Sequence, residues 1–175
     1  MLDAEGHVKL IDFGLAKRLG ERRSTSLVGT NAYLAPEQVL PGRQHGKEVD
    51  WYALGVLIYE LVFGEPPFTA ENRFELYEQI KFDPVWFPEG TDGILQDLLT
   101  GLLCKESASR LGTVGGAKAI QDHPWFNGID WDEFEARQGR PPSLSVGAAD
   151  SETTEDSLED NFQDSDSAEN TFEGF

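Results

Sequence analysis

The chain of 175 residues contains only one cysteine, Cys104, so no disulfide can form within it. Cys104 follows an apolar run at residues 98–103, and we expect its thiol to be buried and structural rather than reactive. No apolar stretch approaches the roughly 20 residues of a transmembrane helix, and the N-terminus has no signal-peptide pattern. These absences favour a soluble, intracellular protein, which we expect in the cytoplasm.

Basic residues are scarce, because 14 Lys and Arg stand against 32 Asp and Glu, which gives a formal net charge of −18. The final stretch, residues 147–175, contains acidic residues and no Lys or Arg. Binding to nucleic acids or to anionic membranes depends on clusters of basic side chains. We therefore expect neither a nucleic-acid partner nor a membrane partner.

Hydropathy and turn residues together predict a mainly α-helical protein. Residues 1–11 have the turn residues and the short apolar run of a β-hairpin, whereas residues 15–34 are polar enough for an exposed loop. Residues 47–63 are apolar nearly all round, which predicts a buried central helix that ends at Gly64. Further helices are predicted at residues 70–82, 92–104 and 117–122. Ser, Thr, Asp, Glu and Gly dominate after Arg140, and we expect disorder there.

Six short motifs follow one another along the first 126 residues. In order they are Asp12-Phe13-Gly14, Gly29-Thr30 with Tyr33-Leu34-Ala35-Pro36-Glu37, Asp50-Trp51-Tyr52-Ala53-Leu54-Gly55-Val56, Pro66-Pro67-Phe68, Arg110-Leu111-Gly112 and His123-Pro124-Trp125-Phe126. Each alone could arise by chance, but their common order and spacing are hard to explain that way. The series resembles the lower lobe of the AGC group of serine/threonine protein kinases, the group of the cyclic-AMP-dependent kinase.

This resemblance implies the fold of a protein-kinase C-terminal lobe, helical and with a short β-hairpin before the D-F-G motif. Residues 1–135 would form the lobe, residues 12–37 its activation segment, and residues 136–175 a largely disordered AGC-type tail. The upper lobe and the catalytic loop have no counterpart in the sequence. The short acidic tail is closest in style to the cyclic-nucleotide-dependent kinases.

The D-F-G motif implies the cofactors. In kinases of this group its aspartate holds Mg²⁺ against the phosphates of ATP. The resemblance therefore implies that Asp12 is a Mg²⁺ ligand and that ATP is the nucleotide. Phe13 would pack differently in active and inactive states, and Gly14 would let the backbone turn.

Three further residues resemble structural positions of the family. Glu37 and Arg110 resemble a pair that forms a buried salt bridge beneath the activation segment. We expect this pair to clamp the geometry rather than to add much stability, because desolvation offsets much of the attraction between the charges. Asp50 resembles the helix residue that anchors the catalytic loop, and without that loop we expect Asp50 to lack its partner.

The activation segment contains a candidate phosphorylation site. When the motifs are aligned on Gly29-Thr30, Ser26 takes the place of the AGC activation-loop phosphosite. A phosphate there would order the loop by pairing with a basic side chain, for which Lys17 and Arg18 are available. Thr30 belongs to the same activation segment.

Two neighbours, Ser24 and Thr25, remain alternatives to Ser26 as the modified residue, and an unmodified, solvated loop serine is the third possibility. Arg22-Arg23 directly precede them. This basic pair resembles a recognition element for an upstream activating kinase.

The resemblance also implies part of the substrate preference. Leu27, Leu34 and the residues between them resemble the pocket for the residue that follows the phospho-acceptor. Glu60 matches a family acid that pairs with arginine in the substrate, so we expect protein substrates with basic residues near Ser or Thr. Asn31-Ala32 replace the usual Pro-Glu, which removes one acidic contact and predicts a weaker or altered basic preference.

The tail carries three aromatic residues that resemble AGC features. Phe172 and Phe175 match the F-x-x-F hydrophobic motif, which docks into a pocket of a kinase upper lobe. Phe162 resembles the tail aromatic that lies near the nucleotide. Aromatic side chains on an otherwise hydrophilic segment are suited to anchoring it in a pocket.

Several parts required for phosphoryl transfer have no counterpart here. The sequence has no Gly-rich loop, no strand lysine with its helix glutamate, and no H-R-D motif with its catalytic aspartate. We therefore expect the chain alone to be inactive and to be a fragment of a kinase that phosphorylates Ser or Thr. Two alternatives stay open: a non-catalytic docking module built on a kinase lobe, and one half of a split kinase completed in trans.

Overall fold

The computed structural model describes residues 1–3, 6–19 and 23–138. The chain divides into two units, residues 1–141 and 142–175, and all described residues belong to the first. The tail aromatics Phe162, Phe172 and Phe175 therefore lie outside the described residues, as does Arg22.

Most regular structure in the described part of the chain is helical, which confirms the expected fold class. The helices are α1 (Pro36–Val39), α2 (Glu48–Phe63), α3 (Arg73–Phe82), α4 (Gly93–Leu102), α5 (Gly116–Gln121) and α6 (Trp131–Glu135), with 3-10 turns η1 (Asn31–Tyr33) and η2 (Pro124–Phe126). A small parallel pair, β1 (Leu111–Gly112) and β2 (Val114–Gly115), pairs Leu111 with Val114. None of the helices within the described ranges is long and apolar enough to cross a membrane.

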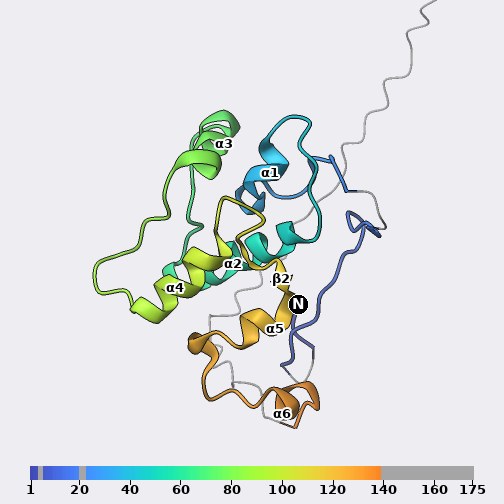
Figure 1. Ribbon diagram of the computed structural model, residues 1–175, viewed down its shortest axis with the longest axis vertical. Helices are drawn as coiled ribbons and strands as arrows, with labels where there is room; N and C mark the ends of the chain where they lie inside the picture. The colour runs from blue at the N-terminus through green and yellow to red at the C-terminus, as the bar shows by residue number, and fades with distance from the viewer. Residues whose placement is uncertain (4–5, 20–22, 139–175) are drawn as a thin grey trace, which may run out of the picture. The chain divides into compact units, whose positions relative to one another are not determined.

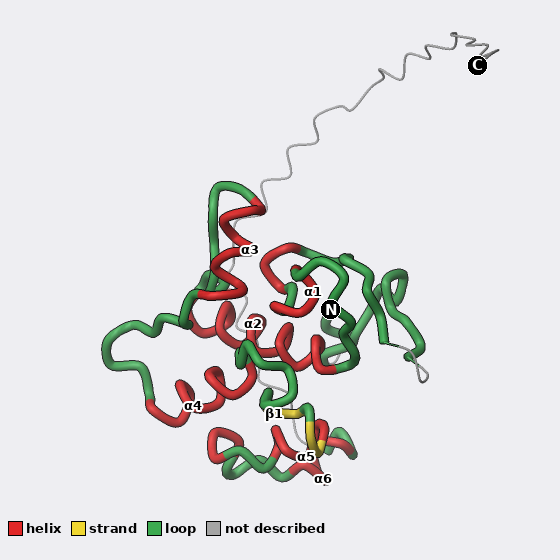
Figure 2. The backbone as a smooth tube through the Cα atoms, turned by 45° about the horizontal axis from the view of Figure 1, so that its top comes forward, coloured by secondary structure: helices red, strands yellow, loops and turns green. Residues whose placement is uncertain are grey.

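Helix α2 is the centre of the fold, as its apolar sequence predicts. It passes between α1 and α4 in both views (Figures 1 and 2). Tyr52, Val56 and Tyr59 are buried against Leu99 and other residues of α4. The two helices approach closely at Gly55, where a Cβ atom would lie 2.8 Å from the Cβ of Leu102.

A second apolar cluster connects the activation segment to α3. It contains five buried residues: Leu34, Val39, Phe68, Leu76 and Ile80. A third cluster packs α4 against α5 through Leu98, Leu102 and Ile120. The end of the activation segment is thus attached to the same core that α2 and α4 build.

Helix boundaries follow from side-chain caps. The Asn72 side chain accepts hydrogen bonds from the backbone N–H groups of Phe74 and Glu75, both at 3.0 Å, so α3 begins at Arg73 rather than at residue 70. Asp92 caps α4 in the same way through Leu95 N, at 3.2 Å.

Two predictions need correction. Helix α4 ends at Leu102, so Cys104 lies beyond it, half-buried, and its thiol donates to the carbonyl of Glu106 at 3.4 Å instead of being enclosed in the core. The N-terminal hairpin forms but is shorter than predicted: Leu2 and Val8 make an antiparallel bridge, flanked by backbone hydrogen bonds from Asp3 N to His7 O at 2.9 Å and from Lys9 N to Met1 O at 2.8 Å. The exposed side chains of Val8 and Leu10 give the predicted strand no apolar surface to pack against, and it does not extend.

Candidate functional site

The activation segment begins with an unusual backbone conformation. Asp12 has φ 61°, in the left-handed region where Asp is among the few residues tolerated. Its Oδ1 accepts a hydrogen bond from Gly14 N at 3.1 Å, which supports that turn locally. The Asp12 carboxylate and the Phe13 ring are both exposed. A strained backbone that presents a carboxylate to solvent is typical of functional positions.

The Asp12 carboxylate is not part of a closed metal cage in the described part of the chain. Within the described ranges, no group of three or more His, Cys, Asp or Glu residues could hold an ion by itself. Mg²⁺ in phosphoryl-transfer sites is commonly bound through one or two carboxylates together with substrate phosphates. An exposed Asp12 therefore fits a share of such a site and not a closed protein cage.

The other end of the activation segment is held by a buried ion pair. Arg110 Nη1 lies 2.7 Å from Glu37 Oε1, and Nη2 lies 2.8 Å from Oε2. The guanidinium also donates to the carbonyls of Glu48, at 2.8 Å, and Cys104, at 3.1 Å. Both side chains are almost fully enclosed. This arrangement fixes α1 to the N-terminal end of α2 and to the loop after α4.

A second buried carboxylate continues the network. Glu48 Oε1 accepts from Arg23 Nη2 at 2.7 Å and from the backbone N–H of Gly46 at 3.0 Å. A Cβ atom at Gly46 would lie 2.6 Å from Glu48 Oε2, so glycine is needed for the carboxylate to fold back here. Ser24 and His45 form an antiparallel bridge with two backbone hydrogen bonds of 2.9 and 2.8 Å. The middle of the activation segment is thereby attached to the segment that leads into α2.

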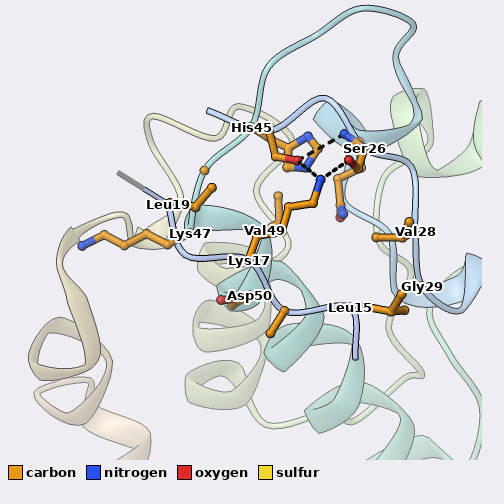
Figure 3. A pocket seen from close by; sticks show the side chains of 14 residues that line it. Leu15, Lys17, Leu19, Ser26, Val28, Gly29, His45, Lys47, Val49 and Asp50 are labelled. Atoms are coloured by element: carbon orange, nitrogen blue, oxygen red, sulfur yellow. Dashed lines mark hydrogen bonds between the residues drawn. The ribbon is translucent and has the colours of Figure 1, made fainter. Parts of the chain in front are cut away.

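A cavity of about 300 Å³ lies between the activation segment and the start of α2. Lys17 Nζ donates to Ser26 Oγ and to Ser24 Oγ, the latter at 3.3 Å. Figure 3 shows Lys17 reaching Ser26 with the His45 ring nearby, while Lys47 points away. The predicted phosphosite and one of its predicted partners, Lys17, are therefore neighbours.

His45 is a buried side chain of this cavity with an unsatisfied polar atom. It is 6% exposed, and its Nδ1 has no hydrogen-bond partner among the described residues. Burial lowers the pKa of its imidazole, against the opposing influence of Glu37 and Glu48. Lys17 and Arg23 act in the same direction as burial. The net effect favours the neutral form of His45.

Asp50 also lines the cavity, farther along α2 from the serines (Figure 3). No hydrogen bond or ion pair to its carboxylate occurs within the described part of the chain. Although the side chain reaches solvent, partial burial raises the pKa of its carboxyl group.

The predicted substrate residues are divided between surface and core. Leu27 is exposed, whereas Leu34 is buried in the cluster with Phe68. Thr30 is exposed, and its carbonyl accepts from Tyr33 N at 3.0 Å at the start of η1.

Glu60 has a specific partner near the end of α2. Tyr33 Oη donates a hydrogen bond to Glu60 Oε2, and this bond raises the pKa of the Tyr33 hydroxyl, with desolvation as a second cause. Nearby, Tyr77 Oη donates to Asn31 Oδ1 at 3.1 Å. The half-buried Glu60 is therefore oriented by η1, and η1 is fixed in turn by α3.

Sequence reasoning missed Glu48 and His45. Neither has a motif or a periodic pattern, because their partners Arg23 and Ser24 lie more than 20 residues away in the chain. The only local signal was a charged residue in the first turn of an otherwise apolar helix.

A family model for the protein kinase domain matches residues 1–126. The chain belongs to the protein kinase family. It is 42% identical to the human cAMP-dependent protein kinase catalytic subunit PRKX over 155 residues, which cover 88% of this chain and 43% of that protein. It is 46% identical over 144 residues to serine/threonine-protein kinase gad8 of Schizosaccharomyces pombe, covering 81% of this chain and 25% of gad8. It is 42% identical to protein kinase C of Drosophila melanogaster over 144 residues, which cover 81% of this chain and 19% of that kinase.

These relatives are AGC-group serine/threonine kinases, and the chain is a member of that group. It spans less than half the length of each of them. A helical kinase lobe with a small two-stranded sheet agrees with this membership.

Proposed function

We propose that this chain supplies the C-terminal-lobe part of a kinase that transfers the γ-phosphate of ATP to Ser or Thr of protein substrates. The observation that carries the proposal is the buried Glu37–Arg110 pair, which holds the end of the activation segment on α2. Phosphoryl transfer depends mainly on positioning and electrostatics. A lobe that fixes the A-P-E end of this segment provides part of that positioning.

Asp12 is the residue proposed to hold Mg²⁺. Bound Mg²⁺ bridges and neutralises the phosphate oxygens of the nucleotide. The exposed carboxylate of Asp12 and its left-handed backbone, supported by Gly14 N, suit this role. The proposed use of ATP is compatible with the intracellular, cytoplasmic location that we propose.

The 175 residues by themselves are proposed not to transfer phosphate. Asp50 lines a cavity and has no hydrogen-bond partner among the described residues, which is the arrangement expected where a catalytic loop would be anchored. The sequence contains no H-R-D aspartate to accept the proton of a substrate hydroxyl.

The test is a radiolabelled-phosphate transfer assay on the purified chain with Mg-ATP and a basic serine peptide. Asp12→Asn is the matched control. We expect no transfer above this control. Transfer that Asp12→Asn abolishes would show that the chain is active by itself, and it would favour an enzyme that uses other residues for the missing roles.

Substrate recognition is proposed to involve Glu60 and Leu27. Glu60 is oriented by Tyr33 and would attract arginine in the substrate, and the exposed Leu27 would contact the residue after the phospho-acceptor. Leu34 contributes indirectly, by anchoring this region in the core. Ala32 stands where the resembled kinases have an acid, and Asn31 beside it is held by Tyr77, so the basic preference is proposed to be weaker.

Ser26 is proposed as a site of phosphorylation by an upstream kinase. Its hydroxyl already accepts from Lys17, and a phosphate there would strengthen this contact through charge. Phe172 and Phe175 are proposed to dock into a kinase upper lobe, with Phe162 near the nucleotide; these three residues lie outside the described part of the chain.

A further inference from the structure

The cavity beside Ser26 contains a buried nitrogen group that the unmodified chain does not use. His45 is 6% exposed, lines the cavity, and has an Nδ1 atom with no partner in the described residues. A buried polar atom without a hydrogen bond costs free energy, so its retention calls for an explanation.

The backbone brings this ring to the activation segment. Two backbone hydrogen bonds pair His45 with Ser24. His45 therefore lies opposite a residue only two positions before Ser26. Lys17 extends between Ser24 and Ser26 beside the ring (Figure 3).

We propose that the His45 imidazole is the second nitrogen group, beside the Lys17 ammonium, that receives a phosphate carried by Ser26. The inference rests on the proposed phosphorylation of Ser26 and deepens it, because it assigns the partner within this chain. The cavity, at about 300 Å³, is many times larger than the roughly 10–15 Å³ that one water needs by a comparable measure. The cavity that both side chains line therefore has room for a phosphoryl group.

The other basic groups are less suited to this role. Arg23 is bound to the buried Glu48 at 2.7 Å, and its removal would leave a buried carboxylate with only the N–H of Gly46. Lys47 points away from the serines (Figure 3). Arg18 does not line the cavity, whereas His45 lines it and would gain a partner without another group losing one.

Phosphorylation would also change the charge of His45. Glu37 from α1 and Glu48 from α2 favour the imidazolium, whereas burial, Lys17 and Arg23 disfavour it, and the neutral form prevails. A phosphate adds nearly two negative charges. An opposite charge within about 4–6 Å moves a pKa by about 1–3 units toward the charged form. The phosphate would therefore shift the imidazole toward its protonated form, and the contact would weaken as the pH rises and that proton is lost.

The test is an NMR titration of the 175-residue chain with serine or genetically encoded phosphoserine at position 26. The chain has three histidines, so His7 and His123 serve as internal references, and His45→Gln assigns the third signal. A matched control places phosphoserine at the exposed position Thr25, which adds the same charge outside the lining of the cavity.

We expect phosphoserine at position 26 to raise the pKa of His45 by at least about one unit, with no such change for His7 or His123. Phosphoserine at position 25 should produce a much smaller shift. Phosphorus NMR should show a lowered second pKa of the phosphate, and His45→Gln should reverse part of it. This phosphorus readout does not depend on the histidine signal.

An unchanged pKa of His45 with phosphoserine at position 26 would overturn the inference. So would equal shifts for positions 25 and 26. The proposed function is judged separately, in a fusion that joins the part of human PRKX preceding its D-F-G to this chain at Asp12. If the fusion transfers phosphate but His45 does not respond, only the inference fails; if His45 responds in an inactive fusion, only the proposed function fails.

Discussion

Replacing Arg110 with methionine should destabilise this lobe more than any other single charge removal in the network. Its guanidinium makes two hydrogen bonds to Glu37 and one each to the carbonyls of Glu48 and Cys104, all between 2.7 and 3.1 Å. It also lies 5.1 Å from the centre of the Tyr52 ring. Arg110→Met keeps much of the apolar volume but removes every one of these polar contacts.

The size of the effect follows from the carboxylate left behind. The side chain of Glu37 is 4% exposed, so without Arg110 its charge would be buried and unpaired. Breaking such a pair from one side typically costs about 3–5 kcal/mol. At roughly 2–4 °C per kcal/mol for a domain of this size, Tm should fall by about 10 °C.

The assay is urea unfolding followed by circular dichroism, for the wild type, Arg110→Met, Glu37→Gln and the double variant. The double variant should lose clearly less than the sum of the two single losses, because no buried charge remains. Arg43→Met, at an exposed position, should change the free energy of unfolding by less than about 0.5 kcal/mol. Additive losses within about 0.5 kcal/mol would refute the idea that the two side chains act as a pair.

Three other outcomes are expected. Gly55→Ala should cost about 1–3 kcal/mol in urea unfolding, because the added methyl group meets Leu102 at 2.8 Å; a neutral effect would mean that the two helices are not so close. Burial lowers the pKa of Lys105 to about 8, so the unfolded chain binds more protons between about pH 8 and 10.5, and the wild type should gain stability over Lys105→Met as pH rises from 7.5 to 9.5. A flat difference between the two unfolding curves would contradict this. Leu61, which is 76% exposed on α2, should tolerate Leu61→Gln without loss of Tm and with a larger soluble fraction on expression; a lower Tm would show that it is packed.

The central helix and its neighbours could be predicted because their patterns are local. Residues 47–63 are apolar on nearly every face, and Gly64 ends α2 with φ 86°. Asp92 marks the start of α4 by capping it. The order of the six sequence motifs was sufficient to predict the AGC kinase group without knowledge of any contact.

What the sequence did not reveal depends on contacts between distant residues or on very short elements. The Arg23–Glu48 pair and the Ser24–His45 bridge join residues that have no periodic relation. Strands β1 and β2 contain two residues each, too few for an alternating pattern. Helix α6 was not predicted, although Asp130 is a suitable N-cap residue in the sequence. Its side chain accepts a hydrogen bond from Glu133 N at 3.0 Å.

The exposure of Leu34 and Cys104 was harder to judge for a related reason. Leu34 directly follows η1, and Cys104 lies two residues after the end of α4. The point at which each helix ends determines whether the side chain that follows faces the core. Leu34 enters the cluster with Phe68 because η1 turns the chain there, and Cys104 leaves the core because α4 stops two residues earlier. Hydropathy alone does not fix such endpoints.

Phosphate transfer by the fusion with human PRKX, compared with the same fusion carrying Asp12→Asn, tests the central claim most directly. We expect the fusion to transfer phosphate from Mg-ATP to a basic serine peptide and Asp12→Asn to lower the rate at least about 100-fold. Loss of one electrostatic group in an active site typically lowers the rate by about this factor. A folded fusion that binds Mg-ATP and transfers no more phosphate than its Asp12→Asn variant would contradict the claim that this chain supplies a working kinase lobe.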